Sequence, residues 1–276
     1  MRFSLNSFTL PTLAFITAAC QPAEKEEESA QNSTVQNNIQ STDSNNESEA
    51  SRPAFETIKL DNITLNLVSF DSRLHSLQVA DQSKGLGKEW EDAKSAASDH
   101  SAIAAINGGF FTPEEKPLGL VIENGVTFGS FNRSSLGAGI FYNTGSSSAI
   151  VRSSQWKEVQ KSKPKQLLQS GPMLVEDNSS TKGLSDSSSR VRSFIAWDGK
   201  NRWCIGHASA CTLRELGLVL EKASPNGWKI STALNLDGGR SSDLWVSSAL
   251  TDTGSALIIR PFWNKPVRNF LVLKTK

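Results

Sequence analysis

The sequence has little cysteine, no long basic stretch, and no long apolar run beyond its first twenty residues. Three cysteines in 276 residues are too few to build a disulfide scaffold. Lysine and arginine (29) nearly balance aspartate and glutamate (28), and no basic stripe alternates with aromatic residues. Because nucleic-acid binding needs such a surface, we expect no nucleic-acid partner. Internal repeats are also missing.

The overall composition is that of an ordinary soluble domain. Hydrophobic residues make up 37% of the chain and charged residues 21%. These fractions exclude a collagen, a coiled coil and a wholly disordered chain. The chain is therefore long enough and apolar enough to bury a hydrophobic core.

Residues 1–20 have the features of an export signal. They begin with Met1 and Arg2, continue through an apolar run, and end on Thr17-Ala-Ala-Cys20. The ending is similar to a bacterial lipobox, in which the cysteine is lipidated, although Thr17 stands where leucine is usual. We expect Cys20 to be lipidated, so that the exported protein is anchored by lipid to a bacterial membrane. An ordinary signal peptide cut near Ala19 is the alternative.

Residues 21–54 differ sharply in composition from the rest of the chain. They are rich in Gln, Asn, Ser, Thr and Glu, and Val35 and Ile39 are the only large apolar residues among them. Such a segment buries too little apolar surface to offset the entropy of ordering. We therefore predict a disordered, acidic tether followed by a modestly basic domain at residues 55–276.

The domain at residues 55–276 is predicted to be α+β, with a mostly antiparallel or mixed sheet and a few packed helices. Alternating apolar residues predict strands, Asn-Gly and Asp-Gly turns predict hairpins, and a Thr-x-x-Glu capping box predicts a helix start. The predicted elements are strands at 63–68, 75–80, 102–106 and 233–236, hairpins at 118–128 and 192–207, and helices at 88–98 and 212–223. We expect strand 75–80 to return beside strand 63–68.

Two apolar strands each end in a polar residue followed by two glycines. One runs into Asn107-Gly108-Gly109, and the other into Asp237-Gly238-Gly239. Glycine pairs let a ligand approach backbone N–H groups, and such turns bind anions. A single Asn-Gly-Gly is more often a tight structural turn, but two such turns after two buried strands favour a binding site.

These turns belong to a larger pattern, which is listed here in chain order: Asn107-Gly-Gly-Phe-Phe111, Ser170-Gly-Pro172, Arg190-x-Arg192, Leu236-Asp-Gly-Gly-x-Ser-Ser242 and Pro266-Val-Arg-Asn-Phe-Leu-Val272. The pattern resembles the phosphodiester glycosidase family, which includes the domain of the lysosomal uncovering enzyme and bacterial relatives. The resemblance covers roughly residues 60 to 273 and implies cleavage of a glycosidic bond next to a phosphate.

The residues can be assigned to that chemistry. Breaking a sugar C1–O bond usually needs two carboxylates, but a phosphate leaves far more readily than an alkoxide, so one carboxylate with cationic and N–H stabilisation can suffice. We expect Asp237 to be that carboxylate, Arg192 to grip two phosphate oxygens, and Asn107 to complete the catalytic group. The residues expected to orient substrate are Gly108, Gly109, Ser170, Gly171, Gly238, Gly239, Ser241 and Ser242.

A second carboxylate and a sugar platform are less clearly marked. The candidates for a partner carboxylate are Glu176, Asp177, Asp198 and Asp243, of which Asp198 reads as a structural turn residue. Trp245, close to the second glycine turn, is the expected platform for a sugar ring. Arg240 departs from the family, whose members often carry a small residue there; it could add a phosphate contact or narrow the pocket.

The remaining cysteines and His207 allow other interpretations. Cys204 and Cys211 are expected to form a disulfide after export; free buried thiols and a zinc site that includes His207 are the alternatives. A serine hydrolase would pair Ser170 or Ser241 with His207, but no Gly-x-Ser-x-Gly motif is present.

We therefore predict an envelope-anchored hydrolase that cleaves a glycosyl phosphodiester and uses no cofactor or metal. The alternative is a lipoprotein that binds a glycan or phosphoglycan without cleaving it. Such a protein would keep Arg192 and the glycine turns but would not need Asp237. A purely structural envelope protein would leave the paired turns without a purpose.

Overall fold

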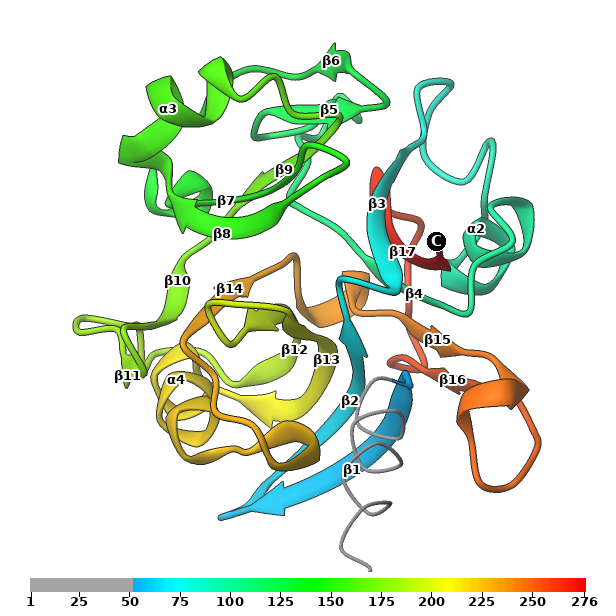
Figure 1. Ribbon diagram of the computed structural model, residues 1–276, viewed down its shortest axis with the longest axis vertical. Helices are drawn as coiled ribbons and strands as arrows, with labels where there is room; N and C mark the ends of the chain where they lie inside the picture. The colour runs from blue at the N-terminus through cyan, green and yellow to red at the C-terminus, as the bar shows by residue number, and fades with distance from the viewer. Residues whose placement is uncertain (1–51) are drawn as a thin grey trace, which may run out of the picture. The chain divides into compact units, whose positions relative to one another are not determined.

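The computed structural model of the protein describes residues 52–276 (Figure 1). The expected signal peptide, Cys20 and all of the tether up to residue 51 lie outside the described residues. No helix in residues 52–276 is long and apolar enough to cross a membrane.

The largest sheet has seven strands in the order β1-β2-β13-β12-β14-β10-β11. Their bounds are β1 (Ala54–Leu60), β2 (Ile63–Asp71), β10 (Met173–Glu176), β11 (Ser179–Ser180), β12 (Arg190–Trp197), β13 (Arg202–Cys211) and β14 (Thr232–Asn235). Helix α4 (Leu213–Lys222) packs against this sheet (Figure 1). The predicted hairpin at 192–207 is confirmed as the β12–β13 pair.

The second sheet has five strands in the order β16-β15-β4-β17-β3. Their bounds are β3 (His75–Asp81), β4 (Ala104–Asn107), β15 (Leu244–Val246), β16 (Leu257–Ile259) and β17 (Asn269–Thr275). Helix α2 (Ala93–Asp99) packs against it through three buried alanines. This helix is shorter than the predicted 88–98 because Asp92 caps its N-terminus, where its carboxylate accepts from Ser95 N (2.8 Å).

The third sheet has five strands in the order β6-β5-β9-β7-β8. Their bounds are β5 (Val121–Glu123), β6 (Val126–Phe128), β7 (Gly139–Asn143), β8 (Ser148–Arg152) and β9 (Gln166–Ser170). The predicted hairpin is present, and Asn124 and Gly125 take the positive φ that its two-residue turn requires. Helix α3 (Trp156–Lys161) covers this sheet (Figure 1).

All strand pairs in residues 52–276 are antiparallel, so the expectation of a mostly antiparallel arrangement is confirmed. One central core holds apolar side chains from all three sheets, among them Ile106, Phe141 and Trp203. Each sheet therefore has one face on the shared core and the other face on its own helix. Short 3-10 turns complete the chain at η1 (Ser135–Gly137), η2 (Ser153–Gln155), η3 (Pro225–Gly227), η4 (Gly239–Ser241) and η5 (Ser248–Leu250).

Helix α4 begins as the sequence predicts. The Thr212 hydroxyl accepts from Glu215 N (3.1 Å), and the Glu215 carboxylate accepts from Thr212 N (2.8 Å). This capping box satisfies two N–H groups at the helix start, and Leu216 and Leu220 are then buried against the seven-stranded sheet.

The predicted pairing of strands 63–68 and 75–80 is wrong. β2 has β1 on one side and β13 on the other, so it has no free edge for a third strand. β3 instead pairs with β17 in the second sheet. The turn at residues 72–74 therefore connects two sheets and does not close a hairpin.

Candidate active site

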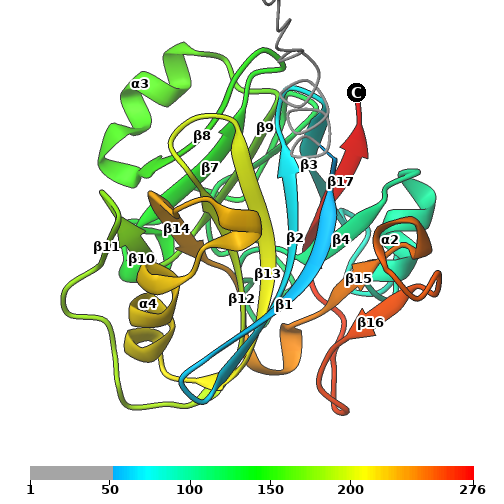
Figure 2. The same cartoon turned by 60° about the horizontal axis from the view of Figure 1, so that its bottom comes forward.

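The two glycine turns singled out in the sequence lie in contact. Asn107 ends β4, and Asp237 follows β14 by two residues. Asp237 N donates to Gly108 O (3.0 Å), and Asn107 Nδ2 donates to Asp237 O (2.6 Å). Figure 2 shows the second turn, η4, as the orange coil at the bottom of the view beside the lower end of β12. The fold therefore joins segments that are 130 residues apart.

Asn107 holds this junction together. Its side chain is fully buried, and its Oδ1 accepts from Ser193 Oγ (2.6 Å) and from Asp243 N (3.0 Å). Its Nδ2 is committed to Asp237 O. Protein groups occupy this amide, and Asn107 positions the backbone of Asp237. Its contact with substrate stays a prediction.

Gly108 and Gly109 also face protein. Gly108 N donates to Asn269 O (2.8 Å), and Gly109 N donates to Asn269 Oδ1 (2.8 Å). A Cβ at Gly108 would overlap the Asn269 side chain, and one at Gly109 would lie 3.2 Å from Gln169 O. These glycines are needed for close packing on β17 and β9. Their role in orienting substrate stays a prediction.

A pocket of about 430 Å³ opens on the second glycine turn. Its lining residues are Phe110, Arg190, Arg192, Asn235, Asp237, Gly238, Gly239, Arg240, Ser241 and Lys265. It brings together five of the predicted site residues: Asp237, Arg192, Gly238, Gly239 and Ser241. The sequence analysis did not assign Phe110, Asn235 or Lys265 to the site.

Asp237 is the only carboxylate among the residues that line this pocket in the described chain. Its Oδ1 accepts from Gly238 N (2.9 Å). Burial raises the pKa of the Asp237 carboxyl, while the Ser241 hydroxyl, the Lys265 ammonium and the Gly238 N–H act in the opposite direction. A carboxylate with a raised pKa is a stronger base than an ordinary aspartate and so accepts a proton more readily.

Four cations surround this carboxylate: Arg190, Arg192, Arg240 and Lys265. None of the four forms an ion pair with an acidic side chain of residues 52–276. Arg192 is buried, and its Nε and Nη2 donate to Cys211 O (3.1 Å) and Ser188 O (2.6 Å). Burial lowers the pKa of its guanidinium, although arginine still stays charged at neutral pH. These two bonds fix the guanidinium and leave its Nη1 without a partner in the described chain.

Asn235 adds an unfilled acceptor to the pocket. Its Nδ2 donates to Gly171 O (2.8 Å) and Leu236 O (2.8 Å), which fixes the orientation of the amide. Its buried Oδ1 has no hydrogen-bond partner within residues 52–276. A ligand hydroxyl could satisfy this oxygen, because buried acceptors are rarely left unpaired.

Ser170, Gly171 and Ser242 lie behind the pocket and do not line it. Ser170 is fully buried at the end of β9, and a Cβ at Gly171 would overlap Ser135 O. The Gly171–Pro172 peptide is cis. Ser242 is buried, and its carbonyl accepts from Asn264 Nδ2 (3.0 Å). Each of the three residues packs against a neighbouring segment and supports the pocket from behind. Their contact with substrate stays a prediction.

None of the four candidates for a partner carboxylate lines the pocket. Asp243 accepts from Ala93 N (2.9 Å), and Asp198 accepts from Lys200 N (2.6 Å) in the hairpin turn. Glu176 is paired with Arg152, and Asp177 lies in the β10–β11 turn. The pocket therefore offers one carboxylate and four cations.

The predicted disulfide between Cys204 and Cys211 is wrong, because both cysteines are free and buried. They stand at the third and last positions of the extended strand β13. Seven residues of strand span about 20 Å, whereas a disulfide needs Cα atoms within about 7 Å. The zinc alternative is not supported either, since residues 52–276 contain no group of three or more potential metal ligands.

His207 is not arranged as a catalytic base. Neither ring nitrogen has a hydrogen-bond partner in the described part of the chain, so neither Ser170 nor Ser241 contacts it. Burial lowers the pKa of His207 to about 4, and the ring is therefore neutral at physiological pH. The serine hydrolase alternative has no support in this geometry.

Trp245 is a packing residue and does not form a sugar platform. It lies on β15 against the alanine-rich core beside helix α2. The exposed aromatic residues are instead Phe262 (90% exposed) and Trp263 (72% exposed). They stand on the loop between β16 and β17, which also carries Lys265 of the pocket.

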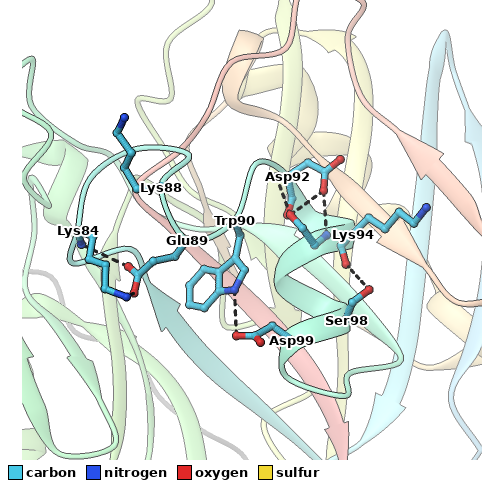
Figure 3. A pocket seen from close by; sticks show the side chains of 9 residues that line it. Lys84, Lys88, Glu89, Trp90, Asp92, Lys94, Ser98 and Asp99 are labelled. Carbon is cyan, nitrogen blue, oxygen red and sulfur yellow. Dashed lines mark hydrogen bonds and ion pairs between the residues drawn. The ribbon is translucent and has the colours of Figure 1, made fainter.

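A larger hollow, of about 950 Å³, lies beside helix α2 (Figure 3). Part of its charge is paired: Lys84 lies 3.5 Å from Glu89, and Trp90 Nε1 donates to Asp99 (3.1 Å). It contains none of the predicted site residues. We therefore assign the site to the smaller pocket, which brings together five of them.

Comparison with known proteins agrees with the resemblance seen in the sequence. No curated protein matches the chain. The catalytic domain of zebrafish N-acetylglucosamine-1-phosphodiester alpha-N-acetylglucosaminidase, auto-inhibited by its pro-peptide, is 15% identical with a TM-score of 0.58, over 82% of this chain and 83% of that one. A hypothetical protein from Synechocystis is 16% identical with a TM-score of 0.55, over 80% of this chain and 61% of that one.

At these identities the two structures show a shared fold only. The family assignment rests on the sequence, because the family model described as phosphodiester glycosidase matches residues 100–274, more than half of the chain. The matched segment contains both glycine turns, Arg192 and the whole pocket lining. The chain therefore belongs to the phosphodiester glycosidase family.

Proposed function

We propose that the protein hydrolyses a glycosyl phosphodiester at the bond between the sugar C1 and the phosphate oxygen. The observation that carries this proposal is the pocket in which Asp237 is the only carboxylate among four cations without acidic partners. An anionic ligand complements that charge, and the fixed guanidinium of Arg192 can hold two phosphate oxygens.

The single carboxylate suits this reaction. The C1–O bond breaks with its electrons going to the phosphate, whose developing charge the arginines and Lys265 stabilise, so no strong acid is needed. Water attacks C1 and gives its proton to Asp237, whose raised pKa makes it an effective base. The products are the free sugar and a phosphate monoester. The Asn235 acceptor and the Ser241 hydroxyl are suited to orient sugar hydroxyls.

The test compares the wild-type protein with Asp237→Asn and Arg192→Lys on a panel of sugar-1-phosphodiesters and on aryl glycosides. Asp237→Asn keeps the size of the side chain but removes its charge, so kcat should fall by at least about 100-fold if the carboxylate moves the proton. Arg192→Lys keeps the positive charge but loses the planar guanidinium that can bind two phosphate oxygens at once. It should weaken the binding of phosphodiester substrates and leave the binding of aryl glycosides unchanged.

Two results would redirect the proposal. Binding across the panel without turnover in the wild type would favour the non-catalytic phosphoglycan-binding protein. Turnover that Asp237→Asn leaves unchanged would keep the enzyme but move catalysis to another group. Leu218→Ala, an exposed apolar truncation on helix α4, is the control for general effects of substitution.

The proposal includes export and a lipid anchor at Cys20. It is supported by the apolar run and the small residues before Cys20 in the sequence. Intact-mass analysis of the membrane fraction should find a chain that begins at a lipidated Cys20. A mature chain that begins elsewhere and stays wholly in the soluble fraction would contradict the anchor.

A further inference from the structure

The pocket carries more positive charge than a single phosphodiester needs. A phosphodiester has one negative charge, whereas Arg190, Arg192, Arg240 and Lys265 surround Asp237 alone. Charges left unpaired at a site favour a ligand that supplies the complementary charge. The excess of cations therefore points to a ligand with several anionic groups.

Two adjacent aromatic side chains stand exposed on the loop next to this pocket. Phe262 is 90% exposed and Trp263 is 72% exposed, and their rings meet edge to face with centroids 4.8 Å apart. No other large apolar side chain in residues 52–276 is exposed beyond 57%. Contiguous exposed apolar patches mark sites where proteins bind ligands, other proteins or membranes.

The loop that carries the pair is bonded directly to the pocket lining. Arg240 Nε donates to Trp263 O (2.8 Å), and Lys265 N donates to Arg240 O (3.0 Å). Asn264 Nδ2 donates to Arg240 O and Ser242 O, both at 3.0 Å. Lys265 Nζ also lies 4.6 Å from the centre of the Phe111 ring. The backbone of the loop at residues 263–265 is therefore fixed beside the pocket, and it places the aromatic pair at the pocket rim. Figure 2 shows this loop, after β16, beside the orange turn η4.

We propose that Phe262 and Trp263 form a carbohydrate subsite and that the substrate is a chain of sugars joined by phosphodiesters. One phosphate occupies the pocket at Arg192. A neighbouring sugar stacks on the aromatic pair, and the next phosphate binds the exposed guanidinium groups of Arg190 and Arg240. This inference rests on the proposed function, which it narrows to polymeric substrates.

The test measures binding of synthetic N-acetylglucosamine-1-phosphodiesters that contain one, two or three phosphate units. The full chain carries Asp237→Asn, so that no ligand is consumed during calorimetry. The three-unit ligand should bind about tenfold more tightly than the one-unit ligand, because a stacked ring and a second ion pair together contribute on the order of 1–2 kcal/mol. In parallel, kcat/KM of the wild type should rise with length.

Variants separate the subsite from general effects. Trp263→Ala should reduce the gain with length to about twofold or less, and Trp263→Phe should restore most of it because a ring remains to stack. Arg240→Gln should also reduce the gain. Leu218→Ala, which truncates an exposed side chain on α4, should keep the full gain. Melting temperatures of all variants report whether the loop still folds.

The inference would be overturned if affinity did not depend on the number of phosphate units in the ligand. It would also be overturned if the rise in affinity with that number persisted in Trp263→Ala. Flotation with phosphatidylglycerol vesicles tests a different occupant. If Trp263→Ala abolishes vesicle binding but leaves the length gain, the aromatic pair contacts lipid and the inference fails. Length-dependent binding without turnover by the wild type would reject the hydrolase and keep the subsite. Turnover by the wild type, with an affinity that does not depend on ligand length, would keep the hydrolase and reject the subsite.

Discussion

At the scale of single residues, the hydrogen bonds of Asn107 fix the position of the Asp237 backbone. Its buried side chain bonds Ser193 Oγ, Asp243 N and Asp237 O, which come from three separate segments. The Asp237 carboxylate thus stands on a backbone that is held from behind. A group fixed in this way needs little reorganisation during the reaction, which is how preorganised sites lower a barrier.

We expect Asn107→Ala to destabilise the protein by about 3 kcal/mol, because the change leaves buried partners unsatisfied. Urea unfolding monitored by tryptophan fluorescence measures the effect. Asn201→Ala, at an exposed position in the β12–β13 turn, is the matched control and should change stability by less than about 0.5 kcal/mol. Equal stability of the two variants would show that the Asn107 bonds contribute nothing.

The sequence identifies which glycines matter but not what they do. A glycine pair after a strand looks the same whether it makes room for a ligand or for a neighbouring strand. For Gly108 and Gly109, that choice depends on Asn269, about 160 residues away, whose side chain accepts from Gly109 N. Arg190 could have been assigned to the site, since it stands two positions before Arg192 on one strand. No local pattern marks Lys265, because only the course of its loop brings it to the pocket.

At the scale of elements, strand β13 explains why the cysteine pair was misassigned. Cys204 and Cys211 are seven positions apart, a spacing that allows a disulfide across a turn but not along an extended strand. The capping box at Thr212 and the Asn124–Gly125 turn were predictable because each depends on residues within four positions of one another. The sheet that β3 joins was not predictable in this way, because it depends on β13 occupying the other edge of β2.

Both thiols should therefore be protected from reagents in the native state. Burial raises the pKa of the Cys211 thiol to about 11 and that of Cys204 still further, so little thiolate exists at neutral pH. Alkylation followed by peptide mapping should label Cys204 and Cys211 only after unfolding, and reducing agents should leave the melting temperature unchanged. A peptide that contains the two cysteines joined by a disulfide would contradict the structure.

Glu123 connects two sheets and should make stability depend on pH. On β5, it accepts from Asp81 N of β3 (3.4 Å), and burial raises its pKa to about 7, with the Asp81 and Glu89 charges acting in the same direction. A raised carboxyl pKa favours the protonated folded form. Its stabilising contribution is therefore complete below about pH 4.5 and is lost as the pH rises towards 7.

Glu123→Gln mimics the protonated form, so the variant should gain stability relative to the wild type as the pH rises from 4.5 to 8. The expected gain is on the order of 2 kcal/mol in the free energy of unfolding. Urea unfolding at the two pH values measures it. The exposed substitution Glu91→Gln should show no such pH-dependent difference. A constant difference between Glu123→Gln and the wild type would refute the assignment.

At the scale of the whole molecule, the residues that hold the two glycine turns in place differ from the residues that line the pocket. The three sheets share one core, and residues from β4, β9, β12 and β17 hold the glycine turns in place. The groups that face the pocket come from β12, the end of β14, the η4 turn, the loop before β17 and Phe110 after β4. Arg190 and Arg240 are exposed, where salt can reach them, whereas Arg192 is buried.

The Michaelis constant for a phosphodiester substrate should rise several-fold between about 50 mM and about 500 mM NaCl, because screening weakens attraction between exposed charges. Neutral aryl glycosides should show no comparable rise. Steady-state kinetics at matched pH measure both. A salt response that is equal for charged and neutral substrates would show that the cations do not bind the phosphate.

The position of β17 has a consequence for when the pocket can form. This strand, at residues 269–275, lies between β3 and β4, and its Asn269 supports the Gly109 turn. It follows every other described element in the chain. A chain in which residues 269–275 have not yet been made therefore lacks the strand between β3 and β4 and the side chain that supports the Gly109 turn. We expect the pocket to form only after β17 has docked, late in the folding of the domain.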